Sequence, residues 1–272
     1  MEHLKFENTQ VYNFEGALRG MRNPKNSWHL SDSAFGVTCY DDALTEYVDE
    51  VTYSYIDNSD DPAFEEKSSY LQHNGVKSVG KYEWKFDLIG AKDMKLAQRL
   101  INGGSEHRKF LRQIFVCVDI TAPLYYWKEF DTYKVGTVAN STSTMHKLAE
   151  TPITRDCFLL DKANDDLNMT DVLETWQLGI FIDDIVAQCE TLRQLYLQTK
   201  NVQYWRALVQ LLPNSWCQTR TVTMNYENLL SICKQRRNHK LPEWREDFIN
   251  WARSLPYAQD FIFIDELDNT LS

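Results

Sequence analysis

The stretch that most constrains the fold of this sequence lies between residues 110 and 144. From residue 110 to residue 121, apolar side chains recur with a period of two and β-branched residues are frequent, which predicts a strand. The periodic positions are Phe110, Ile114, Val116, Val118 and Ile120. Pro123 lacks only an N–H that would be unpaired in the first turn of a helix, and no Gly or Pro occurs in the next ten residues. We therefore expect a helix to leave the strand at Pro123.

A polar segment follows this predicted helix. It contains Gly136, Thr137, Asn140 and the run Ser141–Thr144. Short polar side chains of this kind hydrogen-bond to nearby backbone groups, so they favour loops and helix caps. The sequence thus predicts a polar loop after a helix that leaves a sheet.

The spacing of these residues resembles the signature of the flavin-dependent thymidylate synthases. That signature reads Pro, five residues, Gln, two residues, Arg-His-Arg, two residues, Ser, one residue, Asn, two residues and Ser. Counted from Pro123 without a gap, Glu129 falls at the Gln and Thr137 at the first Ser. The Arg-His-Arg triplet is replaced by Thr132, Tyr133 and Lys134, and one inserted residue puts Asn140 and Ser143 at the last two positions. The spacing of the signature is kept better than its side-chain chemistry.

A second stretch resembles the same family. The family has a Leu-Pro, an Asn twelve residues after the Pro, and an Arg eleven residues further on. This chain has Leu212-Pro213, Asn225 and Arg236 at those offsets, and the segment 239–245 follows where the family has a His-Ala-Gln-x-Glu segment. Upstream, Glu106-His107 is similar to the end of the family's lead-in to the strand. The resemblance extends over roughly residues 88–256.

The resemblance implies a fold and an activity. The expected fold is α+β and ThyX-like, a sheet with packed helices, in a homotetramer because that family builds its sites between subunits. The expected activity is transfer of a one-carbon unit to a pyrimidine deoxynucleotide such as dUMP. FAD carries this reaction in the family, and NADPH and methylenetetrahydrofolate are the co-substrates. The aromatic-rich helices expected after residue 170 also present more apolar surface than a small domain usually needs.

The resemblance also implies roles for individual residues. Its cofactor-binding positions are Glu129, Thr132, Tyr133, Lys134 and His107. Its substrate-binding positions are Asn140, Ser141, Ser143 and Arg236, and the candidate catalytic residues are Ser143 and Lys134. Structural roles are the alternatives: the run of hydroxyl residues can cap a helix, Arg236 can favour a helix C-terminus, and His107 can be structural.

The changed triplet leaves two functions open. Arg offers a fixed charge on a planar fork, whereas Thr and Tyr carry no charge and Lys carries only a point charge. The first function is a divergent one-carbon transferase, in which Lys134 keeps one anionic contact and Tyr125, Tyr126 or Trp127 stacks on a ring. The second is a non-catalytic nucleotide-binding or assembly protein that keeps the scaffold without flavin.

Composition excludes several other classes. A formal charge of −10 argues against general nucleic-acid binding, and nowhere are there eighteen consecutive apolar residues, so we expect no membrane span. The six cysteines contain no Cys-x-x-Cys pair, which predicts no metal site of that kind and reduced, mostly buried thiols in a cytoplasmic protein. Common hydrolase, P-loop and Rossmann motifs are also missing from the sequence.

Residues 1–80 are expected to form an N-terminal segment packed on a ThyX-like domain of residues 81–272. This segment contains a basic turn at 18–28, which could be a phosphate loop or an ordinary surface turn, and an acidic insertion at 41–67. Further along, residues 82–88 alternate like a strand, and Asp93 is predicted to cap a helix that ends at Gly103-Gly104. Four later helices are predicted at 170–200, 202–212, 219–237 and 242–255.

Overall fold

A computed structural model of the chain describes residues 4–39, 76–78, 83–161, 165–170 and 175–267. The contacts divide the chain into two compact units. Unit 1 contains residues 1–8, 118–134 and 138–222, and unit 2 contains residues 9–117, 135–137 and 223–272. The predicted acidic insertion at 41–67 lies outside the described residues.

The largest sheet has four strands in the order β1-β5-β9-β6. Their bounds are Lys5–Tyr12 for β1, Phe115–Pro123 for β5, Cys217–Asn225 for β9 and Val138–Ser141 for β6. Strand β5 confirms the predicted period, because Val116, Val118 and Ile120 are fully buried. It begins at Phe115 rather than near residue 110, since Lys109–Gln113 forms the 3-10 helix η3, and it extends to Pro123. The mixture of sheet and helices confirms the α+β prediction.

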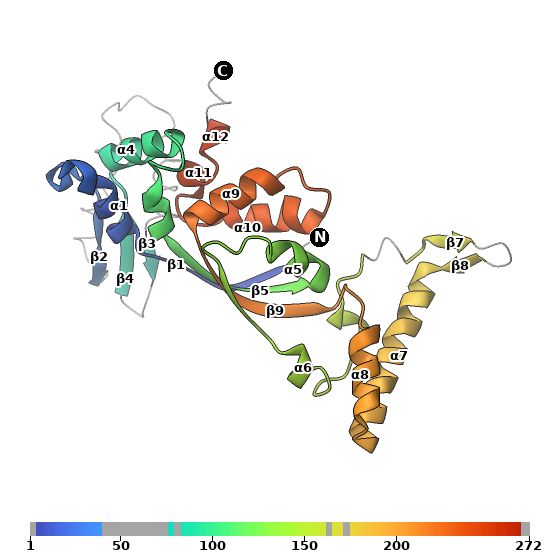
Figure 1. The fold of residues 1–272 in the computed structure, drawn as a ribbon. Coiled ribbons are helices and arrows are strands. Elements are labelled where there is room, and N and C mark those ends of the chain that lie inside the picture. Colours follow the sequence, from blue (N-terminus) through green and yellow to red (C-terminus); the bar gives the residue numbers. More distant parts are fainter. Residues whose placement is uncertain (1–3, 40–75, 79–82, 162–164, 171–174, 268–272) are drawn as a thin grey trace. The chain divides into compact units, whose positions relative to one another are not determined.

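Unit 1 continues from β5 into helix α5 (Leu124–Phe130), β6, the short helix α6 (Thr144–Lys147) and the 3-10 turn η4 (Arg155–Cys157). The two-stranded ribbon of β7 (Asn168–Thr170) and β8 (Thr175–Gln177) then leads into α7 (Leu178–Thr199). Helix α8 (Val202–Leu211) lies alongside α7 (Figure 1). Asn201 caps α8, because its side-chain oxygen accepts the Gln203 N–H at 3.0 Å. The prediction of a helix from residue 170 is therefore wrong in its start, because β8 precedes α7.

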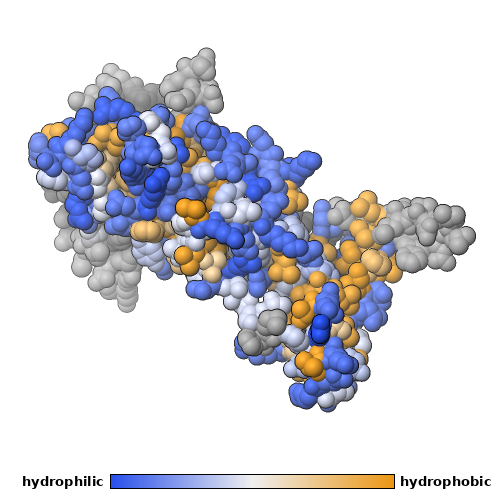
Figure 2. Space-filling model, in the orientation of Figure 1, coloured by the Kyte–Doolittle hydropathy of each residue, from blue (hydrophilic) through white to orange (hydrophobic). Residues whose placement is uncertain are grey.

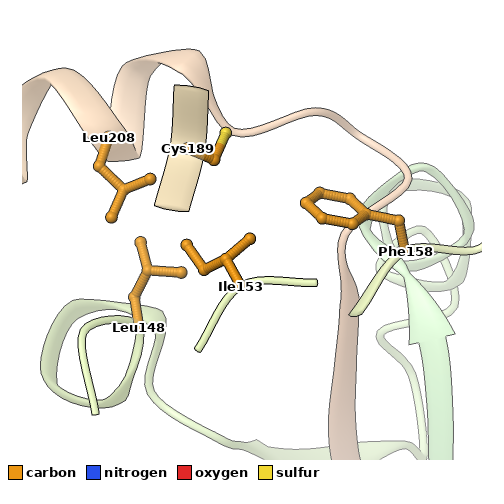
Figure 3. Close-up of a cluster of buried hydrophobic side chains, with 5 residues drawn as sticks. All are labelled: Leu148, Ile153, Phe158, Cys189 and Leu208. Carbon is orange, nitrogen blue, oxygen red and sulfur yellow. The ribbon is translucent and has the colours of Figure 1, made fainter. Parts of the chain in front are cut away.

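A compact hydrophobic cluster joins these helices to the chain before them. Leu148, Ile153 and Phe158 point toward Cys189 of α7 and Leu208 of α8 (Figure 3). All five side chains are buried. The helix pair of unit 1 is therefore held by side chains from residues 148–158 as well as by its own interface.

Unit 2 starts with α1 (Phe14–Arg22), the 3-10 turns η1 (Asn23–Lys25) and η2 (Trp28–Leu30), and an antiparallel sheet in the order β2-β4-β3. The bounds of this sheet's strands are Ala34–Cys39 for β2, Val76–Ser78 for β3 and Glu83–Leu88 for β4. The helices that follow are α4 (Ala91–Asn102), η3, α9 (Tyr226–Arg236), the π-helix η6 (Glu243–Phe248), α10 (Ile249–Arg253), α11 (Ala258–Phe261) and α12 (Ile264–Leu267). Buried rings pack edge to face at its centre, with Phe14 5.7 Å from Tyr226 and 5.6 Å from Tyr257. Strand β4 confirms the strand predicted at 82–88.

The prediction of a helix over 219–237 is wrong in its first third. Residues 217–225 form strand β9, and the helix begins only at Tyr226. Asn225 ends the strand and caps α9 in a capping box, since its side chain accepts the Asn228 N–H at 3.0 Å and Asn228 Oδ1 accepts the Asn225 N–H at 3.2 Å. The β-branched residues Thr219, Thr221 and Thr223 favour the extended conformation.

Asp93 does not cap its helix, contrary to prediction. The helix α4 begins at Ala91, and the side chain of Asp32 accepts the N–H groups of Lys92 and Asp93 at 2.8 and 3.1 Å. Asp93 is fully buried, pairs with Arg22 at 2.5 Å and accepts hydrogen bonds from Ser31 and Ser33. Arg22 of the basic turn at 18–28 therefore forms an internal ion pair with Asp93. The helix predicted at 242–255 is divided into η6 and α10.

Among the described residues, no helix combines the length and apolar composition needed to cross a membrane. Cys117, Cys157, Cys189, Cys217 and Cys233 are free thiols, as predicted. Only Cys189 and Cys233 of these are buried, so the expectation of mostly buried thiols is wrong for the other three.

Candidate functional site

Helix α5 carries the aromatic part of the predicted signature, and its rings serve packing within unit 1. Tyr126, Trp127 and Phe130 are buried, with ring centroids 5.6 Å apart for Tyr126 and Trp127 and 5.4 Å apart for Trp127 and Phe130. The Trp127 indole N–H donates to the Gln218 carbonyl oxygen at 2.9 Å. Tyr126 and Trp127 are therefore core residues and do not present a face for stacking on a ligand ring. Tyr125 is half-buried.

The substituted triplet follows directly after α5. The Thr132 hydroxyl donates to the Glu129 carbonyl oxygen at 2.7 Å, so it satisfies the C-terminal end of the helix. Glu129 and Tyr133 are half-buried, whereas Lys134 is exposed. Within the described ranges, the Lys134 ammonium group has no hydrogen bond or ion pair. Of the three substituted positions, Lys134 is thus the one with an accessible charge.

A cation that the sequence did not indicate lies beside α5. Arg220 of β9 places its guanidinium carbon 4.3 Å from the centre of the Trp127 ring. Its Nη1 donates to Asp131 at 2.8 Å, and its Nε donates to the Gln218 side chain at 3.1 Å. A strand puts residues two apart on the same face, so correct assignment of β9 would have paired Gln218 with Arg220. Their meeting with Trp127 and Asp131 depends on tertiary structure.

The predicted substrate residues lie on and just after β6. Asn140 and Ser141 are exposed on this strand, whereas Ser143 is partly buried and lies directly before α6. The Ser143 carbonyl accepts the Lys147 N–H at 2.9 Å, and the Thr142 N–H donates to the Thr219 carbonyl oxygen at 2.9 Å. The predicted polar loop is therefore a short edge strand followed by a helix start, because its backbone pairs with β9.

The thiol of Cys217, at the start of β9, is not an activated nucleophile. Burial raises its pKa to about 11, so it is protonated at neutral pH. Ser143 and Lys134 remain the candidate catalytic residues of this segment.

The turn of residues 135–137 belongs to unit 2 and lies on the start of α9. Gly136 has a φ of 81°, and a Cβ there would lie 2.9 Å from Asn228 Oδ1 and 3.0 Å from Asn225 Nδ2. The Asn228 amide also donates to the Val135 carbonyl oxygen at 2.7 Å. Glycine is needed at this position for both its backbone angle and the close approach. Asn225, a residue of the second matching stretch, is occupied with this structural role.

Arg236 lies in the last turn of α9, in unit 2. Its guanidinium carbon is 4.9 Å from the centre of the Trp244 ring, and Trp244 is fully buried in the π-helix η6. Cation–π contact with a buried ring restrains the position of an arginine side chain. π-Helical turns are frequent at functional sites.

His107 also belongs to unit 2, in the turn between α4 and η3. The residue is exposed, and its backbone N–H donates to the Gly104 carbonyl oxygen at 3.0 Å. A Cβ at Gly103 would lie 3.2 Å from the His107 ring, so this glycine leaves room for the imidazole. In the part of the chain that the structure describes, the imidazole has no hydrogen-bonding partner.

The predicted residues are therefore divided between the two units. Unit 1 holds Glu129, Thr132, Tyr133, Lys134, Asn140, Ser141 and Ser143, and unit 2 holds His107 and Arg236. No group of three or more metal-ligating side chains with the geometry of a metal site occurs among the described residues.

Comparison with known proteins identifies the fold. No family model matches the sequence, and neither does any curated protein. Two crystal structures of thymidylate synthase X (ThyX) from Helicobacter pylori with FAD and dUMP match this chain over 97% of its length. The first has a TM-score of 0.55 with 14% identity over 98% of its own chain, and the second has 0.56 with 15% identity over 99%. The chain thus has a ThyX-like fold over almost its whole length.

Proposed function

We propose that this chain binds a pyrimidine deoxynucleotide such as dUMP and transfers a one-carbon unit to it, as a divergent counterpart of the flavin-dependent thymidylate synthases. The observation that carries the proposal is Arg236, held against the buried Trp244 ring on a fold that matches nucleotide-bound structures over nearly its full length. A restrained guanidinium group is suited to a nucleotide phosphate, since its planar fork donates two parallel hydrogen bonds.

The remaining polar residues supply hydrogen bonds rather than charge. Asn140 and Ser141 are exposed, and Ser143 is partly buried. Amide and hydroxyl groups of this kind can donate to a phosphate or pair with the edge of a pyrimidine ring. We assign these three residues to substrate binding and Ser143 to positioning the reacting ring.

FAD is the part of the proposal that these residues support least. The accessible donors are the Lys134 ammonium group and the His107 imidazole, both exposed, with Tyr133 and Glu129 half-buried. When bound, FAD would carry the reduction, with NADPH and methylenetetrahydrofolate as co-substrates. Lys134 would hold an anionic group of the cofactor, and this residue supplies one point charge where the family's triplet supplies two guanidinium forks.

A second function is favoured by the packing of α5. Thr132 is bonded to its own helix and the Tyr126 and Trp127 rings are buried, so the segment has exchanged ligand contacts for internal ones. A non-catalytic nucleotide-binding or assembly protein would need only this internal packing of α5 and no flavin contacts from it. The visible absorbance of the freshly purified protein separates the two, because bound oxidised flavin is yellow. Colourless protein that fails to take up added FAD, yet binds dUMP, supports the second function.

Nucleotide binding is tested by titration calorimetry with dUMP. Arg236→Ala should weaken binding at least tenfold, because hydrogen bonds to charged groups contribute about 1.5–3 kcal/mol. Arg99→Ala is the matched control, since Arg99 is exposed on α4 of the same unit and has no ion pair among the described residues. Absence of dUMP binding by the unsubstituted protein, or equal binding by the two variants, contradicts the proposal.

We also propose that the protein assembles as a homotetramer. Ile180 and Phe181 of α7 and Val202 and Leu211 of α8 are exposed, and hydrophobic residues lie at the surface of this helix pair (Figure 2). Exposed apolar groups in one region favour contact with another protein surface. Light scattering should give about four times the chain mass of 31.9 kDa. A monomer at micromolar concentration would contradict a site built between subunits.

A further inference from the structure

Unit 2 contains a cleft that the proposed function does not use. The cavity has a volume of about 180 Å³ and is bounded by the end of α4, the turn before η3, one side of α9 and the segment around α12. Ile101, Leu230, Ile262 and Ile264 form its apolar wall. Three cations also line it, Arg108, Lys234 and Arg237, against a single carboxylate, Asp265.

Arg108 is fixed in the cleft through one of its three nitrogens. Its Nε donates to both carboxylate oxygens of Glu227, at 2.8 and 3.1 Å. The two terminal nitrogens make no hydrogen bond within the described ranges. The side chain is therefore oriented by Glu227 and keeps four N–H donors for another group.

Arg237 is held by its two terminal nitrogens, whereas Arg108 is held by its Nε. Its Nη2 donates to both oxygens of Asp265, at 2.8 and 3.0 Å, and its Nη1 lies 3.4 Å from Glu266. Its Nε is buried, and no atom of the described residues accepts its hydrogen. Asp265 and Glu266 thus fix the Arg237 guanidinium group at the edge of the cleft, where it adds positive charge.

Lys234 completes the set as an exposed ammonium group that has no ion pair among the described residues. Its position in the last turn of α9 is favourable for a cation because of the helix dipole, and the same holds for Arg237 at the end of that helix. The dipole does not account for Arg108, which comes from a different element. The overall composition does not account for the cations of the cleft either, since the chain carries a formal charge of −10.

We propose that this cleft binds a small phosphate monoester, distinct from the nucleotide assigned to Arg236. The terminal nitrogens of Arg108 and the ammonium group of Lys234 would hold the phosphate dianion, and the organic part would lie against Ile101 and Leu230. Phosphate is favoured over a single carboxylate because the free donors come from two cations on different elements, which suits a doubly charged group. The ligand class is a small phosphorylated metabolite with an apolar portion.

The test is calorimetric titration of the full chain with phenyl phosphate. We expect Lys234→Glu to weaken binding at least about tenfold, whereas Lys95→Glu should leave it unchanged. Lys95 is the matched control because it is exposed on α4 and does not line the cleft. Lys234 makes no bond that folding depends on in the described part of the chain, so circular dichroism should show both variants folded with similar melting temperatures.

Two further measurements locate the site and identify the ligand class. Lys234→Glu should bind dUMP as tightly as the unsubstituted protein does, because the nucleotide is assigned to Arg236, which does not line the cleft. Inorganic phosphate and benzoate should both bind more weakly than phenyl phosphate, since each lacks one half of the ligand. Equal affinity of Lys234→Glu and Lys95→Glu for phenyl phosphate, loss of dUMP binding in Lys234→Glu, or benzoate binding as tight as that of phenyl phosphate would overturn the proposal.

Discussion

The two units use their cations in different ways. In unit 2, Arg108, Arg236 and Arg237 are each held by a carboxylate or a ring, and the terminal nitrogens of Arg108 make no hydrogen bond within the described ranges. In unit 1, the Arg220 guanidinium group lies over the Trp127 ring and donates hydrogen bonds to Gln218 and Asp131. The other cation of its signature segment, Lys134, is exposed and has no partner in the described ranges. Among the cations of the candidate site and the cleft, the arginines of unit 2 are therefore restrained, whereas the charge of the signature segment in unit 1 is the exposed Lys134 ammonium group.

This difference bears on where an anion would bind well. A restrained cation loses little side-chain entropy when it binds a ligand, whereas immobilising a long flexible side chain costs about 0.5–1.5 kcal/mol. In unit 1, Thr132 and Tyr133 carry no charge, whereas in unit 2 Arg236 and Arg237 are held by a ring and a carboxylate. Under the proposed function, phosphate recognition would therefore depend more on unit 2 than on the segment of residues 123–144.

The largest effect is expected for a buried residue of α5 in unit 1, where a substitution should reduce the free energy of unfolding. Trp127→Ala should destabilise the protein by about 3–5 kcal/mol, because it removes a buried ring, its bond to Gln218 and the platform for Arg220. Urea unfolding followed by circular dichroism measures this loss. Trp28→Ala is the matched control, since Trp28 is 48% exposed. A stable Trp127→Ala protein that lost only ligand binding would show that the ring serves a site.

Glu190 in unit 1 and Asp260 in unit 2 should affect stability in opposite ways when the pH is lowered. In unit 1, hydrogen bonds from Arg193 lower the pKa of Glu190 to about 2, with further bonds from Ile153 N–H and Gln194. Because the folded-state pKa lies below the usual value of 4.5, this stability is present above pH 4.5 and is lost as pH falls toward 2. Glu190→Gln should therefore cost about 2 kcal/mol at pH 7 and progressively less below pH 4.5.

Urea titrations at pH 7 and pH 3.5 measure this change. Glu150→Gln provides the control, because the Lys147–Glu150 pair is largely exposed and should contribute less than about 0.5 kcal/mol. Equal losses in the two variants at pH 7 would refute the role of Glu190.

In unit 2, burial raises the pKa of Asp260 to about 6. Its Oδ1 accepts from Gln98 at 3.3 Å, while Oδ2 is buried and accepts no hydrogen bond from the described residues. A raised carboxyl pKa means that stability is present at low pH and is lost as pH rises from 3.8 to 6. We therefore compare the free energy of unfolding of Asp260→Asn with that of the unsubstituted protein at each pH. The difference, variant minus unsubstituted protein, should be about 2 kcal/mol more positive at pH 7 than at pH 4. A difference between the two proteins that did not change with pH would contradict a buried, ionisable Asp260.

The sequence predicts those elements whose signal is local. Strand β5 was foreseeable because its apolar period is uninterrupted, and α8 because its helix pattern is bounded by Asn201 and Pro213. Strand β9 was not, since Gln218 and Arg220 occupy its inward face and hide the period of two. The cap of α4 comes from Asp32, sixty residues away, which no local pattern could indicate.

The same limit applies to the sites. The chemistry of Thr132, Tyr133 and Lys134 could be weighed from their identities, but the burial of Tyr126 and Trp127 decides that these rings pack rather than stack on a ligand. The cation cleft joins residues near 101–108, 230–237 and 262–265, so only tertiary structure could bring Arg108 beside Lys234 and Arg237.

The smallest effect on stability, and the sharpest test of the comparison, concerns Lys134. Its side chain is exposed and unbonded within the described ranges, so Lys134→Ala should change the free energy of unfolding by less than about 0.5 kcal/mol. If unit 1 nevertheless holds FAD, this variant should retain less flavin after reconstitution and purification, as measured by absorbance. Lys128→Ala is the control on the same segment, because Lys128 is exposed and already donates to Asn214 at 2.9 Å. Equal flavin retention by the two variants would show that Lys134 does not replace the charge of the missing arginines, and recognition by unit 1 would then rest on its hydrogen-bonding residues alone.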